Sequence, residues 1–191
     1  MADMPKASGY LGGHLLVAMP QMPDPRFARS VVYLCAHTAD GAMGLIVNKL
    51  IDSLSFPDLL RQLGIETQHQ TNAIRVHFGG PVEAARGFVL HSTDWGGHDT
   101  ILVNPLCALS ASVETLRAIA AGRGPSRWLM ALGYAGWGPG QLDKEMRDHG
   151  WYAAKGGADI LFDTPVNARW MATWRGEGID PALLAPETGH A

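Results

Sequence analysis

Short apolar runs separated by turn residues make up the first part of the chain. Residues 14–19 (HLLVAM) and 30–37 (SVVYLCAH) are rich in aliphatic, β-branched and aromatic residues, which is typical of strands. Asp40-Gly41 follows the second run, and residues 43–48 (MGLIVN) are apolar again. The pattern predicts an antiparallel hairpin with a tight turn.

A second antiparallel pair is predicted farther along the chain. Residues 74–78 and 87–92 are apolar runs joined through Gly79-Gly80-Pro81, and we expect them to pair with each other. The other predicted strands are shorter: 101–103, 128–132, 151–154 and 158–162.

Helical patterns lie between and after these strands. Ser55 is expected to cap a helix over 56–63, with Pro57 in its first turn and Gly64 at its end. Two further helices are predicted over 110–121 and 141–149. A last full helix is predicted to begin at Thr164-Pro165, and Asp180-Pro181 predicts a final turn. Hairpin-linked strands followed by about four helices predict an α+β fold, not a doubly wound sheet.

A single domain accounts for the whole chain. It has 191 residues, no repeat and no linker, so we assign one domain over 1–191, with flexible ends at 1–12 and 186–191. The chain is 47% hydrophobic and 17% charged, as expected for a folded protein.

Four glycines and two aromatic residues are concentrated in Gly133-Tyr-Ala-Gly-Trp-Gly-Pro-Gly140, just before a predicted helix. Glycine at this density indicates a sharp turn or a close approach. An anion could be held by the backbone N–H groups here, but no Lys-Ser or Lys-Thr follows, and Asp143 and Glu145 would repel it. A structural turn with Tyr134 and Trp137 packed over it is the favoured interpretation.

Several segments, in order along the chain, closely resemble the bacterial AlgH/YqgE family. They are Gly13–His37 (GHLLVAMPQMPDPRFARSVVYLCAH), Gly41–Lys49 (GAMGLIVNK), Gly79–Val82 (GGPV), Arg86–His91 (RGFVLH), Gly133–Glu145 (GYAGWGPGQLDKE) and Phe162–Pro165 (FDTP), followed by Arg169-Trp170. The resemblance implies a compact domain of the bacterial cytoplasm with a largely antiparallel, barrel-like sheet flanked by helices. Family members are often labelled transcriptional regulators, one branch is named for regulation of alginate synthesis, and no catalytic residue carries over.

Charge and cysteine content narrow the classes of function. The formal net charge is −3 and the basic residues are scattered, which argues against direct nucleic-acid binding. Cys35 and Cys107 lie in apolar runs and are expected to be reduced, buried thiols. The apolar run ending at Met19 is too short for a signal peptide or membrane span, so we expect a cytoplasmic protein without membrane contact.

Two loops are the candidate binding surface. The first, over 20–30, carries a turn-forming Asp-Pro pair, one phenylalanine and two arginines, and the second is the glycine segment. The predicted surface residues are Asp24, Arg26, Phe27, Arg29, Tyr134, Trp137, Gly138 and Gly140. We therefore expect a non-catalytic binding or regulatory protein whose partner is another protein, with no cofactor. The sequence does not predict the oligomeric state.

Two alternatives stay open. His37, His77 and His91 lie at or near predicted strand ends, with His98 and Asp99 beyond them, so a metal- or small-ligand-dependent enzyme could use a histidine rim and the 133–140 loop. None of these pairs has a tight metal-ligand spacing, so ordinary hydrogen-bonded histidines are the favoured interpretation and no metal site is assigned. The other alternative is a direct DNA-binding regulator, although no pair of basic helices is predicted.

Overall fold

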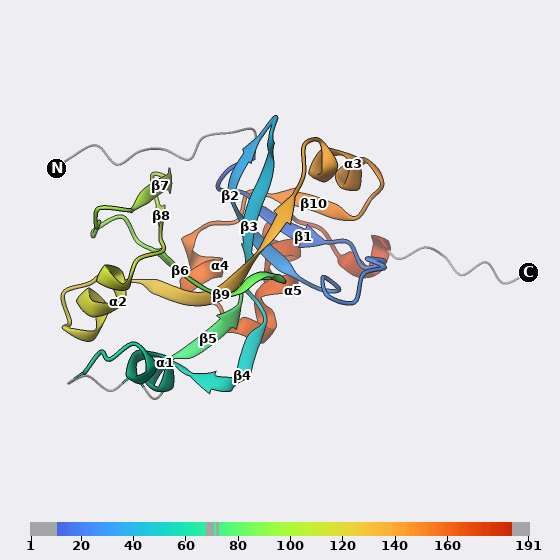
Figure 1. Cartoon of the computed structure of the whole chain (residues 1–191). Helices are drawn as coiled ribbons and strands as arrows, with labels where there is room; N and C mark the ends of the chain where they lie inside the picture. Colours follow the sequence, from blue (N-terminus) through green and yellow to red (C-terminus); the bar gives the residue numbers. More distant parts are fainter. Residues whose placement is uncertain (1–10, 68–70, 72, 185–191) are drawn as a thin grey trace, which may run out of the picture.

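The structure is a computed structural model, and it describes residues 11–67, 71 and 73–184. One ten-stranded, mostly antiparallel sheet forms most of the described chain (Figure 1). The strands are β1 (Leu15–Ala18), β2 (Val31–Thr38), β3 (Gly41–Ile46), β4 (Leu50–Ser55), β5 (Arg75–Phe78), β6 (Val82–His91), β7 (Ile101–Asn104), β8 (Cys107–Ser110), β9 (Trp128–Trp137) and β10 (Trp151–Ala154).

Short helices surround this sheet. They are α1 (Phe56–Gln62), α2 (Val113–Ala120), α3 (Gln141–Arg147), α4 (Ala158–Phe162) and α5 (Arg169–Gly176), with 3₁₀ turns η1 (Val166–Ala168) and η2 (Pro181–Leu184). Figure 1 shows α3 beside β10 at one side of the molecule, and α1 and α2 at the other. The predicted α+β class and single domain with a curled, largely antiparallel sheet are confirmed.

The strand order is β10-β1-β2-β3-β9-β6-β8-β7, and β9 is its centre. β9 pairs antiparallel with β3 through residues 135–137 and with β6 through residues 128–134. It also pairs in parallel with β5, which in turn pairs with β4. One strand therefore has three strand neighbours.

The core is divided between the two faces of the sheet. Alternate residues of β1 and β2, such as Leu15 and Tyr33, join a cluster that Trp170 and Trp174 of α5 cover. On the opposite face, one cluster lies under α1 and α2, and another lies around Leu142 of α3. This alternation is what the period of two along a strand requires.

Three glycines allow the chain to cross over β9 between β5 and β6. A Cβ on Gly79 would lie 2.2 Å from the Gly133 carbonyl oxygen, and one on Gly80 would lie 2.1 Å from the Tyr134 carbonyl carbon. Gly133 has a φ of +74°, and a Cβ there would lie 2.3 Å from the Gly80 carbonyl oxygen. Backbone therefore packs directly on backbone at this crossing, which only glycine permits.

The crossing corrects one predicted pairing. β5 and β6 do not form a hairpin through Gly79-Gly80-Pro81, because both pair with β9, β5 in parallel and β6 antiparallel. β6 also has a register shift between Val82 and Gly87, opposite Gly133, where it bulges out. The glycines thus serve a crossover and not a turn.

Other predicted elements have different outcomes. The hairpin at Asp40-Gly41 is confirmed, and so is α1, where the Asp58 N–H donates to Ser55 Oγ at 3.2 Å. The first part of the glycine segment, residues 133–137, is a strand and not a turn, because β9 continues to Trp137.

Two predictions for the C-terminal third are wrong, one in the type of element and one in where a helix begins. Residues 158–162, predicted as a strand, form helix α4, where the Ile160 N–H donates to the Gly157 carbonyl. The last α-helix does not begin at Thr164-Pro165, because the Thr164 hydroxyl donates to the Asp159 carbonyl and η1 precedes α5.

Two strands, β4 and β8, were not predicted, and Ser110 ends β8 instead of opening a helix. The predicted flexible ends lie largely outside the described residues, apart from positions 11 and 12, which belong to a turn. Within the described part of the chain, no helix has the length and apolar character needed to cross a membrane.

Candidate functional site

Two hollows adjoin at the C-terminal end of β9. The larger has a volume of about 690 Å³ and lies between the β2–β3 hairpin, β6, β7 and β9; we call it the cleft, and it includes Arg86, Phe88, Asp99 and Tyr134. The smaller, of about 380 Å³, is the aromatic pocket. Its lining includes Asp24, Arg26, Phe27, Trp137, Glu145, Asp148 and Trp151. Val82, Gly136 and Trp137 line both hollows, so the two form one surface.

Three aromatic rings from different elements form the walls of the aromatic pocket. Phe27 of the 20–30 loop contacts Trp151 of β10 edge to face, with ring centroids 5.7 Å apart. Trp137 of β9 meets Trp151 in the same manner at 6.0 Å. Both tryptophans are buried and Phe27 is half-buried, so the rings are fixed by packing.

Glu145 of α3 ties these rings together. Its Oε2 accepts hydrogen bonds from Trp137 Nε1 at 2.6 Å and from Trp151 Nε1 at 3.2 Å. Its Oε1 accepts from Gln141 Nε2 at 3.2 Å, and Gln141 lies one helical turn earlier. The carboxylate is thus held between two indoles by neutral donors.

The 20–30 loop presents a charged pair at the edge of the pocket. Arg26 donates to both oxygens of Asp24, with Nη2 2.7 Å from Oδ2, and these hydrogen bonds hold the pKa of Asp24 below its usual value. Lys49 Nζ donates to the Arg26 carbonyl at 2.8 Å and joins the loop to the start of β4. The loop is therefore anchored although the Arg26 side chain is exposed.

The structure brings some predicted surface residues together and separates others. Asp24, Arg26, Phe27 and Trp137 all line the aromatic pocket, and Tyr134 lines the cleft. Arg29 instead stacks on the Trp170 ring, with its guanidinium carbon 4.1 Å from the ring centroid. Gly138 and Gly140 belong to the turn before α3 and are not among the lining residues of either hollow.

The three candidate metal histidines lie in separate places, and His77 and His91 each have their own hydrogen-bond partners. His77 Nδ1 bonds to the Met130 carbonyl at 3.1 Å and its Nε2 accepts from Arg169 at 3.0 Å. His91 bonds to the Ser92 carbonyl and to Ser110 Oγ, both at 2.8 Å. His37 Nε2 lies 3.5 Å from Asp143. No metal-sized group of donors combines these histidines within the part of the chain that the structure describes.

Burial lowers the pKa of two of these histidines. The pKa of His77 is lowered to about 4 by burial and by the Arg169 guanidinium, so the ring is neutral at pH 7. The pKa of His91 is also lowered by burial. Both rings therefore act as hydrogen-bonded structural groups.

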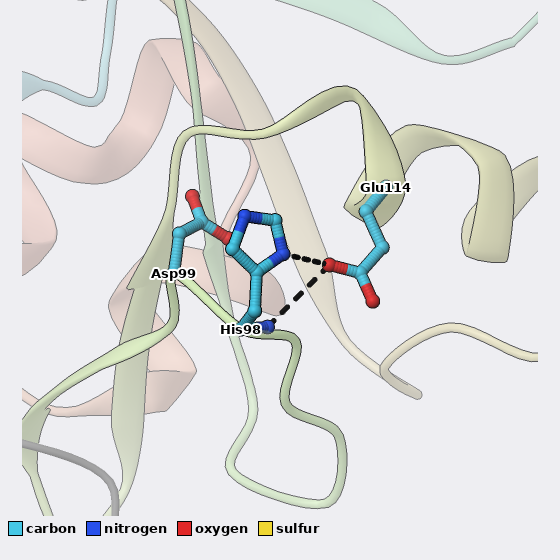
Figure 2. A group of neighbouring side chains, drawn as sticks. All are labelled: His98, Asp99 and Glu114. Carbon is cyan, nitrogen blue, oxygen red and sulfur yellow. Dashed lines mark hydrogen bonds and ion pairs between the residues drawn. The ribbon is translucent and has the colours of Figure 1, made fainter.

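The described residues do contain one group of donors that could hold a metal ion, His98, Asp99 and Glu114. Figure 2 shows this cluster, in which Glu114 of α2 accepts from the backbone N–H and from Nδ1 of His98. Asp99 accepts from the Ala111 N–H and from Ser112 Oγ, at 2.8 and 2.9 Å, just before α2.

The chemistry of this cluster favours a structural role. Glu114 raises the pKa of His98, so a metal ion would have to displace a proton that the ring holds more tightly than usual. The two carboxylates already hold the loop before β7 against the start of α2. Glu114 was missed at the sequence level, because it lies 16 residues after His98.

Sequence reasoning also missed Glu145 and Trp151 as parts of the pocket. The sequence indicates Glu145 only as a charge that would repel an anion at the glycine segment, and Trp151 only as part of a short strand. Their separation of six residues, across the end of α3, has no recognisable spacing, and only the Trp–carboxylate hydrogen bond reveals the pair.

The comparisons place this chain and its fold among known proteins. The model of a family described as AlgH-like matches residues 15–182. A UPF0301 protein from Novosphingobium aromaticivorans is 56% identical over 182 residues, covering 95% of this chain and 97% of the relative. Another from Rhodospirillum rubrum is 50% identical over 186 residues, covering 97% of each.

Two solved structures are similar over most of the chain. The solution structure of the AlgH protein from Pseudomonas aeruginosa is 39% identical, covers 100% of both chains and has a TM-score of 0.78. A crystal structure of a Corynebacterium diphtheriae protein is 19% identical, with a TM-score of 0.74 and coverage of 93% and 92%, and this similarity concerns the fold alone.

Proposed function

This chain belongs to the AlgH-like family, and we propose that it is a non-catalytic bacterial binding protein of the cytoplasm that acts through contacts with another protein. The cleft and the aromatic pocket together form the contact surface. The observation that carries this proposal is the meeting of two segments more than 100 residues apart, with Phe27 and Trp137 lining one pocket. A regulatory effect, on transcription included, would follow from that contact.

A polypeptide partner fits the shape of this surface. The two hollows adjoin and are open, and each is large enough for several side chains. Pairing between β6 and β9 stops at Val82 and Tyr134, so among the described strands residues 135–137 have only β3 as a neighbour. An extended segment could add to this free strand edge while its side chains enter the hollows.

Site-specific photocrosslinking in the native host tests the proposal. A crosslinking amino acid would replace Arg26, at the pocket, or Arg86, at the cleft, since both side chains are exposed. Arg75, which is also exposed and lines neither hollow, is the matched control.

We expect Arg26 and Arg86 to crosslink to the same polypeptide and Arg75 to give no such product. Equal crosslinking from Arg75, or no polypeptide product from either test site, would overturn the proposal. The intact mass of each product identifies the partner for sequencing.

A further inference from the structure

The carboxylate of Glu145 is a negative charge held in place without a positive partner. Its three hydrogen-bond donors are two indole N–H groups and one amide. Its side chain is half-buried, and it forms no ion pair with any residue in the described part of the chain. A charge in this setting lacks the compensation that partly buried charges usually have.

The rest of the pocket lining does not neutralise this charge. Three carboxylates, Asp24, Glu145 and Asp148, line the pocket against one guanidinium, that of Arg26. Arg26 is bound to both oxygens of Asp24, and Asp148, the residue after α3, is paired with Lys144 of that helix. The uncompensated charge is therefore located on Glu145, and an anionic ligand would be repelled.

The walls suit a cation that has an apolar stem. Trp137 and Trp151 adjoin the carboxylate, and Phe27, which contacts Trp151, lines the same pocket. The faces of aromatic rings attract cations through their quadrupole. Met22 and Pro23 add apolar lining that can cover methylene groups. Arginine and lysine combine such a stem with a charged head.

We propose that the aromatic pocket binds the cationic side chain of a partner, an arginine or a lysine, with Glu145 as its counter-ion. The head group lies against the Glu145 carboxylate between the indoles, and the stem packs against the apolar lining. This inference rests on the proposed function and names the partner chemistry at that site.

Indole N–H resonances give a direct test on the full chain. The ¹⁵N-labelled protein would be titrated with N-acetylarginine amide and N-acetyllysine amide, while two-dimensional ¹H–¹⁵N spectra follow the Trp137 and Trp151 Nε1–H signals. N-acetylcitrulline amide has nearly the shape of the arginine probe without its charge, so it is the matched ligand control. N-acetylglutamate amide tests for anion binding.

We expect both signals to shift saturably with the arginine or lysine probe, and not with the citrulline or glutamate probe. Glu145→Gln should weaken that binding at least tenfold, because the charge-assisted contact is lost. Glu114→Gln removes a half-exposed carboxylate from another helix and should leave it unchanged. The comparison of arginine with citrulline on the unaltered protein stands even if Glu145→Gln fails to fold.

Equal shifts with citrulline, or no shift of these two signals with either cationic probe, would overturn the inference. If Arg26 and Arg86 crosslink to one polypeptide but no cationic probe binds, the proposed function survives and this inference fails. If the cationic probes bind but no polypeptide is crosslinked, the pocket is a cation site and the proposed function fails.

Discussion

Arg169 and Glu145 carry opposite charges, and neutral groups hold both. Arg169 of α5 donates to the carbonyl oxygens of Thr164 and Val47 and to Nε2 of His77. Glu145 accepts from two indoles and an amide. Neither has an ion-pair partner among the described residues, yet only 6% of Arg169 is exposed, whereas Glu145 lines a pocket.

The difference shows what each charge can do. Burial lowers the pKa of Arg169 to about 10, which leaves it protonated at pH 7 but sealed from any counter-ion. It can only hold α5 to the sheet. Glu145 is accessible, so its missing counter-ion can come from a partner, and accessibility rather than charge separates a structural group from a binding group.

Removing the buried charge of Arg169 should have the largest effect on stability. Arg169→Ala deletes a buried side chain and the donor to the Val47 carbonyl, and we expect it to lower the free energy of unfolding by about 3 kcal/mol or more. Urea denaturation followed by tryptophan fluorescence measures this. The control is Arg175→Ala on the exposed side of the same helix, which should change it by less than about 0.5 kcal/mol. Similar losses of stability in both variants would contradict the structural role of Arg169.

The partner of Arg169 should make stability depend on pH. His77 has a pKa of about 4 in the fold and 6.5 as its usual value, so only the unfolded chain binds a proton between these values. Its contribution is complete above pH 6.5 and is lost as pH falls to 4, by about 3 kcal/mol. The free energies of unfolding of the parent and of His77→Gln, measured at several pH values, isolate the contribution of His77, because His91 contributes equally to both proteins. Parallel pH profiles of the two proteins would refute the assignment.

Changing the accessible charge should affect stability less. Glu145→Gln keeps an oxygen that can accept from an indole, so we expect a loss of about 1 kcal/mol, the difference between a charged and a neutral acceptor. Thermal unfolding by circular dichroism measures it, with Glu114→Gln as the control. A loss as large as that of Arg169→Ala would make Glu145 a structural residue.

A charge pair at the surface should have the smallest effect. His98 is exposed and bonded to Glu114, so His98→Gln should give no resolvable shift of the melting temperature at pH 7. Titration of His98 by NMR should give a pKa above 6.5, and Glu114→Gln should return it towards that value. An unchanged His98 pKa in Glu114→Gln would contradict the pairing of His98 with Glu114.

Local signals in the sequence predicted the elements that depend on their own neighbours. Ser55 caps α1 and Asp40-Gly41 turns the first hairpin, because a cap or a turn acts within a few residues. The apolar run 158–162 was assigned to the wrong class, since five residues are too few to separate a period of two from one of 3.6.

The candidate site depended on contacts that no local pattern contains. The sequence indicated Phe27 and Trp137 as surface residues, and the fold brings both to one pocket. It could not indicate that Glu145 joins Trp137 to Trp151, because this depends on how α3 packs on β9 and β10. The sequence indicated Gly79 and Gly80 as the link of an antiparallel pair and Gly133 as part of a glycine-rich turn, but the crossing that requires all three joins segments about 50 residues apart.

The position of β9 also constrains the order in which the chain can fold during synthesis. β3, β5 and β6 all leave the ribosome before their common neighbour, residues 128–137. Until that strand appears, they have edges that can pair with other chains, so a nascent chain ending before residue 128 should depend on chaperones. The last third of the protein thus completes the sheet as well as the pocket.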